Sequence, residues 1–510
     1  MKHLLALLFT LLSFGAPAQT SELCPPELAT LPTLAQGRVK PLSVHAAETL
    51  RFITGSEGIG ELAATLAFCR LSFEGLSLPS GLDPEVKIEH VEVRKLLGIS
   101  AEQNFMKASE LAPRSEELRF AHAGVKENNA YKKELNKVLL RLQTLEKIRA
   151  GALWTLPEVE AGKLSWPLLT DFVTEAKITA LKSQHADPFR ALYEQARREH
   201  EQLSGAEHML EYYYTKARPF VWSLVLSLLA LALSFALKNL TVGIVASSVV
   251  LLVEIAGMTL RVLISGRAPI TNMYETVMFS GAGALALGLV LALAKRERVY
   301  LIGGLAYNCL CLMMMKFANN MLDPSISPLV PVLRDNFWLS THVTTIILSY
   351  AALALSWILA NVALIRQSFY GAGMSEVRRE MEQIYDCMKV GVVLLAAGII
   401  LGGVWADYSW GRFWGWDPKE TWSLIVLLIY MAILHGRYSN WITPRSFIPL
   451  TAGAFLSVMM AWFGVNYILA TGLHSYGFSE GGAIFLGAFF AAQLALLALW
   501  YLRFFLSKRA

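Results

Sequence analysis

Residues 388–437 read MKVGVVLLAAGIILGGVWADYSWGRFWGWDPKETWSLIVLLIYMAILHGR, two apolar runs joined by a loop rich in tryptophan. At about 1.5 Å of rise per helical residue, the runs at 388–405 and 420–437 almost reach across a bilayer core of roughly 30 Å. Backbone groups in lipid have no other partner, so each run must be helical. The stretch therefore predicts two membrane-spanning helices.

Similar apolar runs fill the chain beyond Pro219, and the composition agrees with a membrane protein. Of the 510 residues, 55% are hydrophobic and only 17% are charged, which is too apolar for an ordinary soluble enzyme. We predict an all-α fold, a polytopic helical membrane bundle of about nine transmembrane helices preceded by a mainly helical exported domain. The seven further spans are expected at 219–237, 242–264, 274–294, 299–318, 339–365, 446–470 and 483–505.

Charged residues crowd the first 215 positions, which predicts a separate domain there. Residues 1–18 have a basic start, an apolar core and a small-x-small site at Ala16-Pro17-Ala18, the parts of a signal peptide. An uncleaved anchor is the alternative. We expect a signal peptide at 1–18, an exported domain at 19–215 and a membrane domain at 216–510.

The exported domain shows amphipathic helices but no catalytic cluster. Apolar residues of 131–150 recur every three or four positions, and a second helix is expected to start at Asp187-Pro188 and to run toward His208. Cys24 and Cys69 could pair, since exported compartments are oxidising. The histidines here are expected to be solvated: His45, His90, His122, His185, His200 and His208.

The basic loops all fall on one side of the predicted bundle, and the positive-inside rule assigns that side to the cytoplasm. We therefore predict a multi-pass protein of the cytoplasmic membrane. The exported domain and the loop at 406–419 would lie on the periplasmic side.

The loop and its flanks, residues 405–422, hold five of the chain's 13 tryptophans. Asp417 and Glu420 match a capping box that opens the following helix. Trp405 and Trp422 lie at span ends, as belt residues do at membrane interfaces. The remaining loop residues are better candidates for contacts with a flat ligand, and the glycines permit close backbone approach: Trp410, Gly411, Trp414, Gly415 and Trp416.

Two histidines are expected on the same face of the membrane as this loop. His342 lies near the outer end of its span, and His474 follows another span on that side. Each alone could be an ordinary interfacial polar residue. Together, two neutral imidazoles from different helices are what a haem iron needs as axial ligands.

These residues resemble a known family. WGRFWGWDPKETW at 410–422 is similar to the tryptophan-rich WWD signature of the haem-handling proteins of cytochrome c maturation, specifically the CcsA or ResC family and its CcsBA fusions. The likeness extends to GRAPITNMYET at 266–276, PLVPVLRDNFWLSTHV at 328–343, YMAILHGR at 430–437 and NYILATGLHSYG at 466–477.

The resemblance implies that His342 and His474 are the axial ligands of an external haem and that His435 belongs to a possible inner haem site. About 22 Å of helix separates Glu420 from His435, so His435 cannot share an iron with the outer pair. By the same resemblance Asp417 and Arg412 join the tryptophans and glycines of the loop in binding haem, with Trp410, Trp414, Trp416 and Asp417 orienting it. The implied chemistry requires no general acid or base from this chain.

The implied function is attachment of haem b through thioether bonds to CxxCH motifs of exported apocytochrome c, as a holocytochrome c synthase. Expected partners are the apocytochrome, a ResB/CcsB-like membrane partner that supplies a further histidine, a thiol reductant protein and the lipid bilayer, but no nucleic acid. A haem carrier that delivers to a separate chaperone or synthase, a b-type membrane electron carrier and a small-molecule transporter are the alternatives.

Several charged residues have open roles. The cations that could meet haem propionates, or simply be solvated, are Arg267, Arg334, Arg412 and Lys419. Glu254 and Arg261 lie on one helix face at about 10 Å along the axis, too far apart to pair, so each needs another partner. Arg261 could instead snorkel outward.

Overall fold

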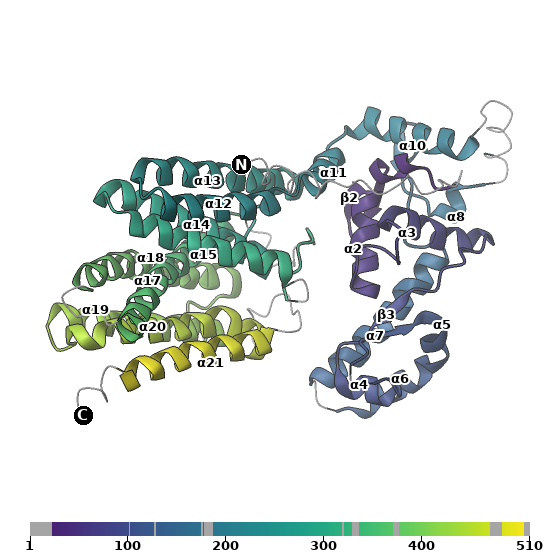
Figure 1. Ribbon diagram of the computed structural model, residues 1–510. Coiled ribbons are helices and arrows are strands. Elements are labelled where there is room, and N and C mark those ends of the chain that lie inside the picture. The colour runs from purple at the N-terminus through teal and green to yellow at the C-terminus, as the bar shows by residue number, and fades with distance from the viewer. Residues whose placement is uncertain are drawn as a thin grey trace. The chain divides into compact units, whose positions relative to one another are not determined.

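The computed structural model describes residues 23–100, 102–126, 129–174, 177, 187–318, 321–328, 336–370, 377–469 and 482–503. The predicted signal peptide at 1–18 lies outside these residues. The chain divides into two compact units, Met1–Lys216 and Ala217–Ala510, which we call the N-terminal unit and the membrane unit (Figure 1).

The N-terminal unit is mainly helical, and its described residues form three short antiparallel hairpins. The hairpins pair β1 (Pro32–Ala35) with β2 (Arg38–Pro41), β3 (Glu85–Lys87) with β4 (Phe105–Lys107), and β5 (Glu158–Glu160) with β6 (Lys163–Ser165). The longer helices are α2 (Leu42–Thr54), α3 (Ala64–Ser72), α6 (Ser115–Gly124), α7 (Ala130–Arg149), α10 (Pro188–Ser204) and α11 (His208–Ala217). Short turns complete it: η2 (Pro26–Thr30), η3 (Phe73–Leu76), α4 (Val91–Leu96), α5 (Ala108–Leu111), η4 (Ala112–Arg114) and α8 (Leu169–Phe172).

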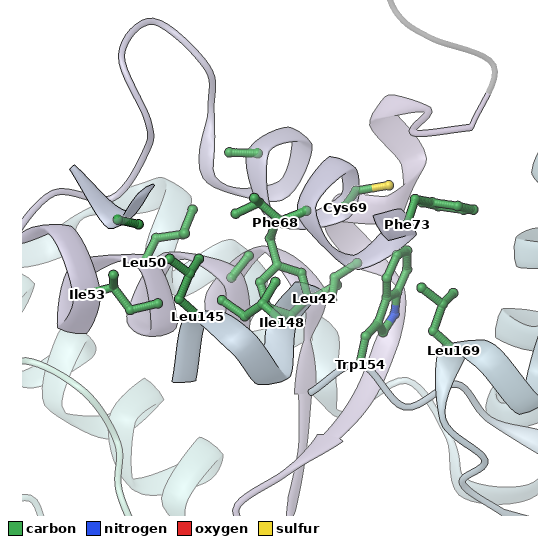
Figure 2. Close-up of a cluster of buried hydrophobic side chains, with 14 of the residues drawn as sticks. Leu42, Leu50, Ile53, Phe68, Cys69, Phe73, Leu145, Ile148, Trp154 and Leu169 are labelled. Atoms are coloured by element: carbon green, nitrogen blue, oxygen red, sulfur yellow. The ribbon is translucent and has the colours of Figure 1, made fainter. Parts of the chain in front are cut away.

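The core of this unit forms where α2, α3 and α7 meet, and the indole of Trp154 packs at one side of it, beside Phe73 and Leu169 (Figure 2). Trp154 is fully buried and stacks on Tyr193 of α10 at 6.0 Å between ring centroids. The apolar stripe predicted within 131–150 faces this core, and Asp187 caps α10 as expected. Helix α10 ends before Gly205 and α11 begins at His208, so the second predicted helix is shorter than its pattern suggested.

Cys24 and Cys69 form a disulfide, with 6.0 Å between their Cα atoms. The bond ties the segment before η2 to α3, and both residues are buried in the core. The pairing that the sequence allowed is therefore confirmed.

The expectation of solvated histidines is wrong for three of them. His45, His200 and His208 are all less than a tenth exposed. His45 Nε2 donates to the Leu153 carbonyl at 2.8 Å, and the rings of His200 and His208 lie 5.3 Å apart. Burial lowers the pKa of His45 to about 4 and that of His200 to about 4. An amphipathic pattern cannot show which neighbouring segment will cover a given face.

The membrane unit is a bundle of long helices that run alongside one another (Figure 1). Among the described residues, nine helices are long and apolar enough to cross a membrane, which confirms the predicted number. The elements are α12 (Pro219–Ala236), α13 (Leu240–Ser265), α14 (Met273–Lys295), α15 (Arg298–Phe317), α16 (Asn336–Trp338), η6 (Leu339–Val343), α17 (Thr344–Phe369), α18 (Arg378–Trp410), α19 (Pro418–Tyr438), α20 (Pro444–Met459), η7 (Met460–Leu469) and α21 (Gly482–Tyr501).

Helices α17 and α18 pack closely because glycines line one face of α18. A Cβ atom added at Gly391 would lie 2.5 Å from the Leu353 side chain, and one at Gly398 would lie 2.6 Å from Ile346. Small residues allow such close approach in membranes, where lipid chains are as apolar as leucine and burial alone drives little association.

Among the named elements of the described residues, two have π-helical rather than α-helical geometry, which the sequence pattern did not predict. They are η6, which contains His342, and η7, which continues α20. A π turn shifts side chains around the helix axis, and such turns are frequent at functional sites.

Candidate functional site

A cavity of about 180 Å³ opens at the end of the membrane unit where α17 begins, α18 ends and α19 begins. One water needs roughly 10–15 Å³ of such space, so the cavity can take a much larger molecule. The side chains that line it are mainly apolar and aromatic, with a few polar groups: Ile270, Thr271, Asn272, Met273, Thr276, His342, Val343, Ile346, Ile347, Tyr350, Ile399, Gly402, Gly403, Trp405, Phe413, Trp414, Lys419, Glu420, Ser423, Ala461, Trp462 and Asn466.

His342 enters this cavity from η6 in a fixed orientation. Its Nδ1 lies 2.9 Å from the Gly398 carbonyl, which can only accept, so Nδ1 carries the proton. In the neutral form of the ring the lone pair is then on Nε2, the atom that can bind a metal. Gly402 makes room for the ring, because a Cβ atom there would lie 2.5 Å from His342 Cε1.

Tryptophans line the cavity, but they are not the three that the sequence predicted. Trp405 is only 3% exposed, lines the cavity and lies 5.8 Å from the His342 ring. It therefore sits inside the protein and not in an interfacial belt. Trp410 stacks on Trp405 at 6.3 Å, and Trp414 lines the cavity directly. Trp416 is 69% exposed and meets Trp414 edge-on at 5.8 Å.

Glu420 organises the tryptophan loop from within. Its carboxylate accepts hydrogen bonds from the backbone N–H groups of Gly415, at 2.7 Å, and Asp417, at 3.3 Å, and pairs with Arg412 at 3.0 Å. Asp417 in turn accepts from the N–H groups of Lys419 and Glu420, which completes the predicted capping box. The start of α19 and the shape of the loop thus depend on the same two carboxylates.

The two loop glycines have distinct conformational roles. Gly411 ends α18 with φ of +66°, a left-handed conformation that other residues rarely adopt. At Gly415 a side chain would collide with the Arg412 guanidinium. Both glycines therefore serve the fold of the loop, whatever it contacts.

The four candidate cations have different surroundings. Lys419 lines the cavity, whereas Arg412 pairs with Glu420 and lies 5.6 Å from the Trp410 ring. Arg267 donates to the Ser327 carbonyl at 2.7 Å. Arg334 lies outside the described residues. Lys419 is thus the candidate best placed to meet an anionic group in the cavity.

The cavity is also lined by residues that the sequence reasoning did not single out. Trp462 in η7 donates from Nε1 to Thr276 Oγ1 of α14 at 3.2 Å, and Asn466 donates to the Trp462 carbonyl at 2.6 Å. Met273 and Thr276 belong to the GRAPITNMYET stretch. Asn466 belongs to NYILATGLHSYG, and both stretches carried the family resemblance. Their shared resemblance was the one sequence signal that could have indicated these residues as part of the site.

Of the other two predicted haem ligands, only His435 belongs to the part of the chain that the structure describes, and it does not line this cavity. His435 is exposed near the end of α19, and its Nδ1 donates to the Met431 carbonyl at 2.9 Å. It lies three helical turns or more from the α19 residues that line the cavity. His474 lies outside the described residues.

The two buried ionisable residues of α13 have separate partners, as their spacing predicted. Arg261 pairs with Glu275 of α14 at 2.6 Å and donates to the carbonyls of Pro324 and Ser325. It is fully buried, so the snorkelling alternative is wrong: the Glu275 carboxylate holds the guanidinium inside the protein. Glu254 accepts from Asn308 Nδ2 at 2.6 Å.

Residues 217–474 match the family described as cytochrome C assembly protein. This range covers half of the chain and includes every residue that lines the cavity. The chain belongs to this family. It is therefore a multi-pass membrane protein with a role in cytochrome c maturation.

Individual proteins agree with this assignment. The chain is 34% identical over 294 residues to the cytochrome c biogenesis protein CcsA of Prochlorococcus marinus strain MIT 9303, covering 49% of this chain and 91% of that protein. It is 36% identical over 230 residues to protein NrfI of Wolinella succinogenes, but these cover 43% of this chain and only 24% of NrfI.

A solved structure of the cytochrome c haem lyase CcmF is also similar, with a TM-score of 0.40 and 16% sequence identity. The match covers 55% of this chain and 50% of that one. This likeness is too weak to support a conclusion about activity.

Proposed function

We propose that the cavity beside the tryptophan loop presents haem b at the periplasmic face of the cytoplasmic membrane and promotes its thioether attachment to CxxCH motifs of apocytochrome c. The observation that carries the proposal is the placement of His342 in an aromatic cavity with its Nδ1 bonded to the Gly398 carbonyl. Family membership makes haem the expected cargo.

The residues present fit a haem. A neutral imidazole with a carbonyl-bonded Nδ1–H is the usual form of a histidine that binds a metal, since the second bond fixes the ring and increases its basicity. Trp405, Trp414 and Trp462 offer flat apolar surfaces to a macrocycle. Lys419 adds a cation that suits a propionate. We propose His474 as the second axial ligand.

The chemistry asks little of the protein beyond positioning. The thiols that become thioethers belong to the apocytochrome, and the vinyl groups belong to haem. The chain would hold the haem and align the incoming peptide, and orientation of this kind can lower a barrier by about 7–11 kcal/mol in favourable cases. This accounts for an activity that uses no acid/base pair of the protein.

An inner haem site at His435 is a second part of the proposal. His435 is exposed on the surface of the membrane unit, where a histidine from a neighbouring protein could approach it. This supports a ResB/CcsB-like membrane partner. A thiol reductant protein would keep the cysteines of the apocytochrome free.

Coexpression with an apocytochrome reporter tests the proposal. The host lacks its own maturation genes and carries the chain with its ResB/CcsB-like partner. We expect covalent haem on the reporter with the wild-type chain and none with His342→Ala, while His122→Ala, in the N-terminal unit, retains full attachment. Bound haem on the wild-type chain without covalent haem on the reporter would instead favour a carrier that delivers to a separate synthase.

A further inference from the structure

A second polar cluster lies within the membrane unit, between α12, α13 and α15. Glu254 and Asn308 are each 1% exposed, and Ser223 and Ser227 of α12 are fully buried. Asn308 Nδ2 donates to Glu254 Oε1 at 2.6 Å and to Ser227 Oγ at 3.2 Å. None of these residues lines the cavity beside the tryptophan loop.

The hydrogen bonding of this cluster is incomplete. Glu254 Oε2, Asn308 Oδ1 and Ser223 Oγ are buried and have no hydrogen-bond partner among the residues that the structure describes. No ion pair joins Glu254 to any part of the chain that the structure describes. The buried thiols of Cys309 and Cys311 on α15 interact electrostatically with Glu254, and a thiol carries no positive charge.

Glu275 provides an internal comparison, because it is equally buried but differently surrounded. Its carboxylate pairs with Arg261 at 2.6 Å and also accepts from the N–H of Thr271 at 2.8 Å and from Thr271 Oγ1 at 2.7 Å. A full positive charge and two further donors therefore balance this carboxylate. Glu254 has one neutral amide donor in their place.

That difference decides the charge state of each acid. An isolated carboxylate in a membrane interior loses its hydration without compensation, and such groups take up a proton instead of remaining charged. One hydrogen bond from an amide offsets only a small part of this loss. Glu275 stays ionised because Arg261 and Thr271 replace its water.

We propose that Glu254 is an intramembrane proton-binding site and that its carboxyl group holds a proton at neutral pH. The ligand of the site is a proton, bound as a neutral carboxylic acid with Asn308 and the α12 serines as its polar surroundings. This inference concerns the residues of this chain alone and does not depend on haem binding.

The site is one helix away from the proposed haem cavity. Thr276 of α14 lines the cavity, and one turn further Ser280 lies 3.0 Å from the Tyr307 hydroxyl of α15. At Gly281 a Cβ atom would lie 2.6 Å from Asn308 Oδ1. Helix α14 thus contacts both sites, and a change in the charge of Glu254 would act on a helix that forms the cavity wall.

Carbodiimide labelling of the full-length protein in liposomes tests the proposal. Dicyclohexylcarbodiimide modifies protonated carboxyl groups in apolar surroundings, and mass spectrometry of the peptides compares both glutamates in one wild-type molecule. We expect label on Glu254 and at least tenfold less on Glu275, with labelling of Glu254 decreasing as the pH is raised and unchanged by added Na⁺ at constant pH.

Infrared spectroscopy supplies a second measurement. The carbonyl band of a protonated carboxylic acid should be present in the wild type, lost in Glu254→Gln and retained in Glu275→Gln. Equal labelling of both glutamates, or a band that persists in Glu254→Gln, would overturn the proposal. Protection of Glu254 by Na⁺ would also overturn it, in favour of a cation site. Because the labelling uses wild-type protein, it remains decisive even if either variant fails to fold.

Discussion

The N-terminal unit and the membrane unit belong to one polypeptide but are stabilised by different interactions. In the N-terminal unit, large side chains such as Trp154 and Phe68 are fully buried around a disulfide. In the membrane unit, only 17% of the apolar stretch of α21 is buried inside the protein. Apolar surface that would be costly in water is acceptable in lipid, so burial alone cannot specify how these helices pack.

What specifies the membrane packing is the absence of side chains at glycines and the pairing of buried polar groups. His342 is held by a carbonyl on one side and by the open space at Gly402 on the other. Adding a single methyl group beside His342 should therefore impair the cavity. The N-terminal unit should instead lose stability when its disulfide is removed or when a buried neutral histidine is protonated.

The largest effect on haem binding is expected from Gly402→Ala. The added Cβ would contact the His342 ring at 2.5 Å, so either the ring or α18 must move. Such overpacking costs about 1–3 kcal/mol, and it falls directly on the proposed ligand. We expect loss of more than nine-tenths of the bound haem at normal expression, measured by absorbance of the purified protein.

The matched control is Gly487→Ala in α21, where a Cβ atom would meet nothing within 4 Å. It should bind haem like the wild type. An equal loss of bound haem in both variants would show that replacing any helical glycine has this effect, and that the space beside His342 is not its cause.

Removal of the Cys24–Cys69 disulfide should destabilise the N-terminal unit by about 4 kcal/mol, the chain-entropy value for a loop of 45 residues. Hydrogen exchange of the Cys24→Ser/Cys69→Ser protein should show faster exchange throughout α2, α3 and α7. Protection of α17 and α18 should be unchanged. Loss of protection in those helices as well would contradict the separation of the two units.

Acid should destabilise the N-terminal unit in a defined window. The pKa of His45 is about 4 in the fold against 6.5 for the free side chain, because the buried ring resists charging. Its neutral form is fully favourable above pH 6.5. As the pH falls from 6.5 to 4, the unfolded state binds a proton that the folded state does not, and stability decreases by up to about 3 kcal/mol.

His45→Gln keeps a donor for the Leu153 carbonyl and removes this titration. Hydrogen exchange of α2 and α3 at several pH values should show a weaker acid dependence in the variant than in the wild type. His200 has a similarly low pKa and accounts for part of what remains. Identical acid dependence in both proteins would refute the assignment to His45.

The smallest effect is expected from the cap of α19. Asp417→Ala removes two hydrogen bonds to backbone N–H groups and should cost about 1 kcal/mol. Because Asp417 also shapes the tryptophan loop, haem affinity should decrease a few-fold in a titration. Asn239→Ala removes the comparable cap of α13 and should leave haem affinity unchanged.

The sequence predicted the features that depend on local pattern. Apolar run length located the nine spans, the spacing of Asp417 and Glu420 located a helix start, and the motifs indicated the family. The separation of Glu254 from Arg261 correctly excluded a direct pair.

Features that depend on helix rotation and on distant neighbours could not be predicted. A tryptophan at a span end looks the same whether it faces lipid or a cavity, so Trp405 was assigned to the interface. The π turns that rotate His342 and Trp462 into position leave no periodic trace in the sequence. Likewise, nothing local showed that other segments would cover His45 and His200.

The most direct test of the central claim is the haem spectrum of purified wild-type protein beside His342→Ala and His435→Ala. We predict that His342→Ala loses or changes the ligation signal of the cavity haem, while His435→Ala, far along α19, leaves that signal intact. Exogenous imidazole should restore it in His342→Ala. A cavity haem signal that is identical in His342→Ala and the wild type would contradict the account.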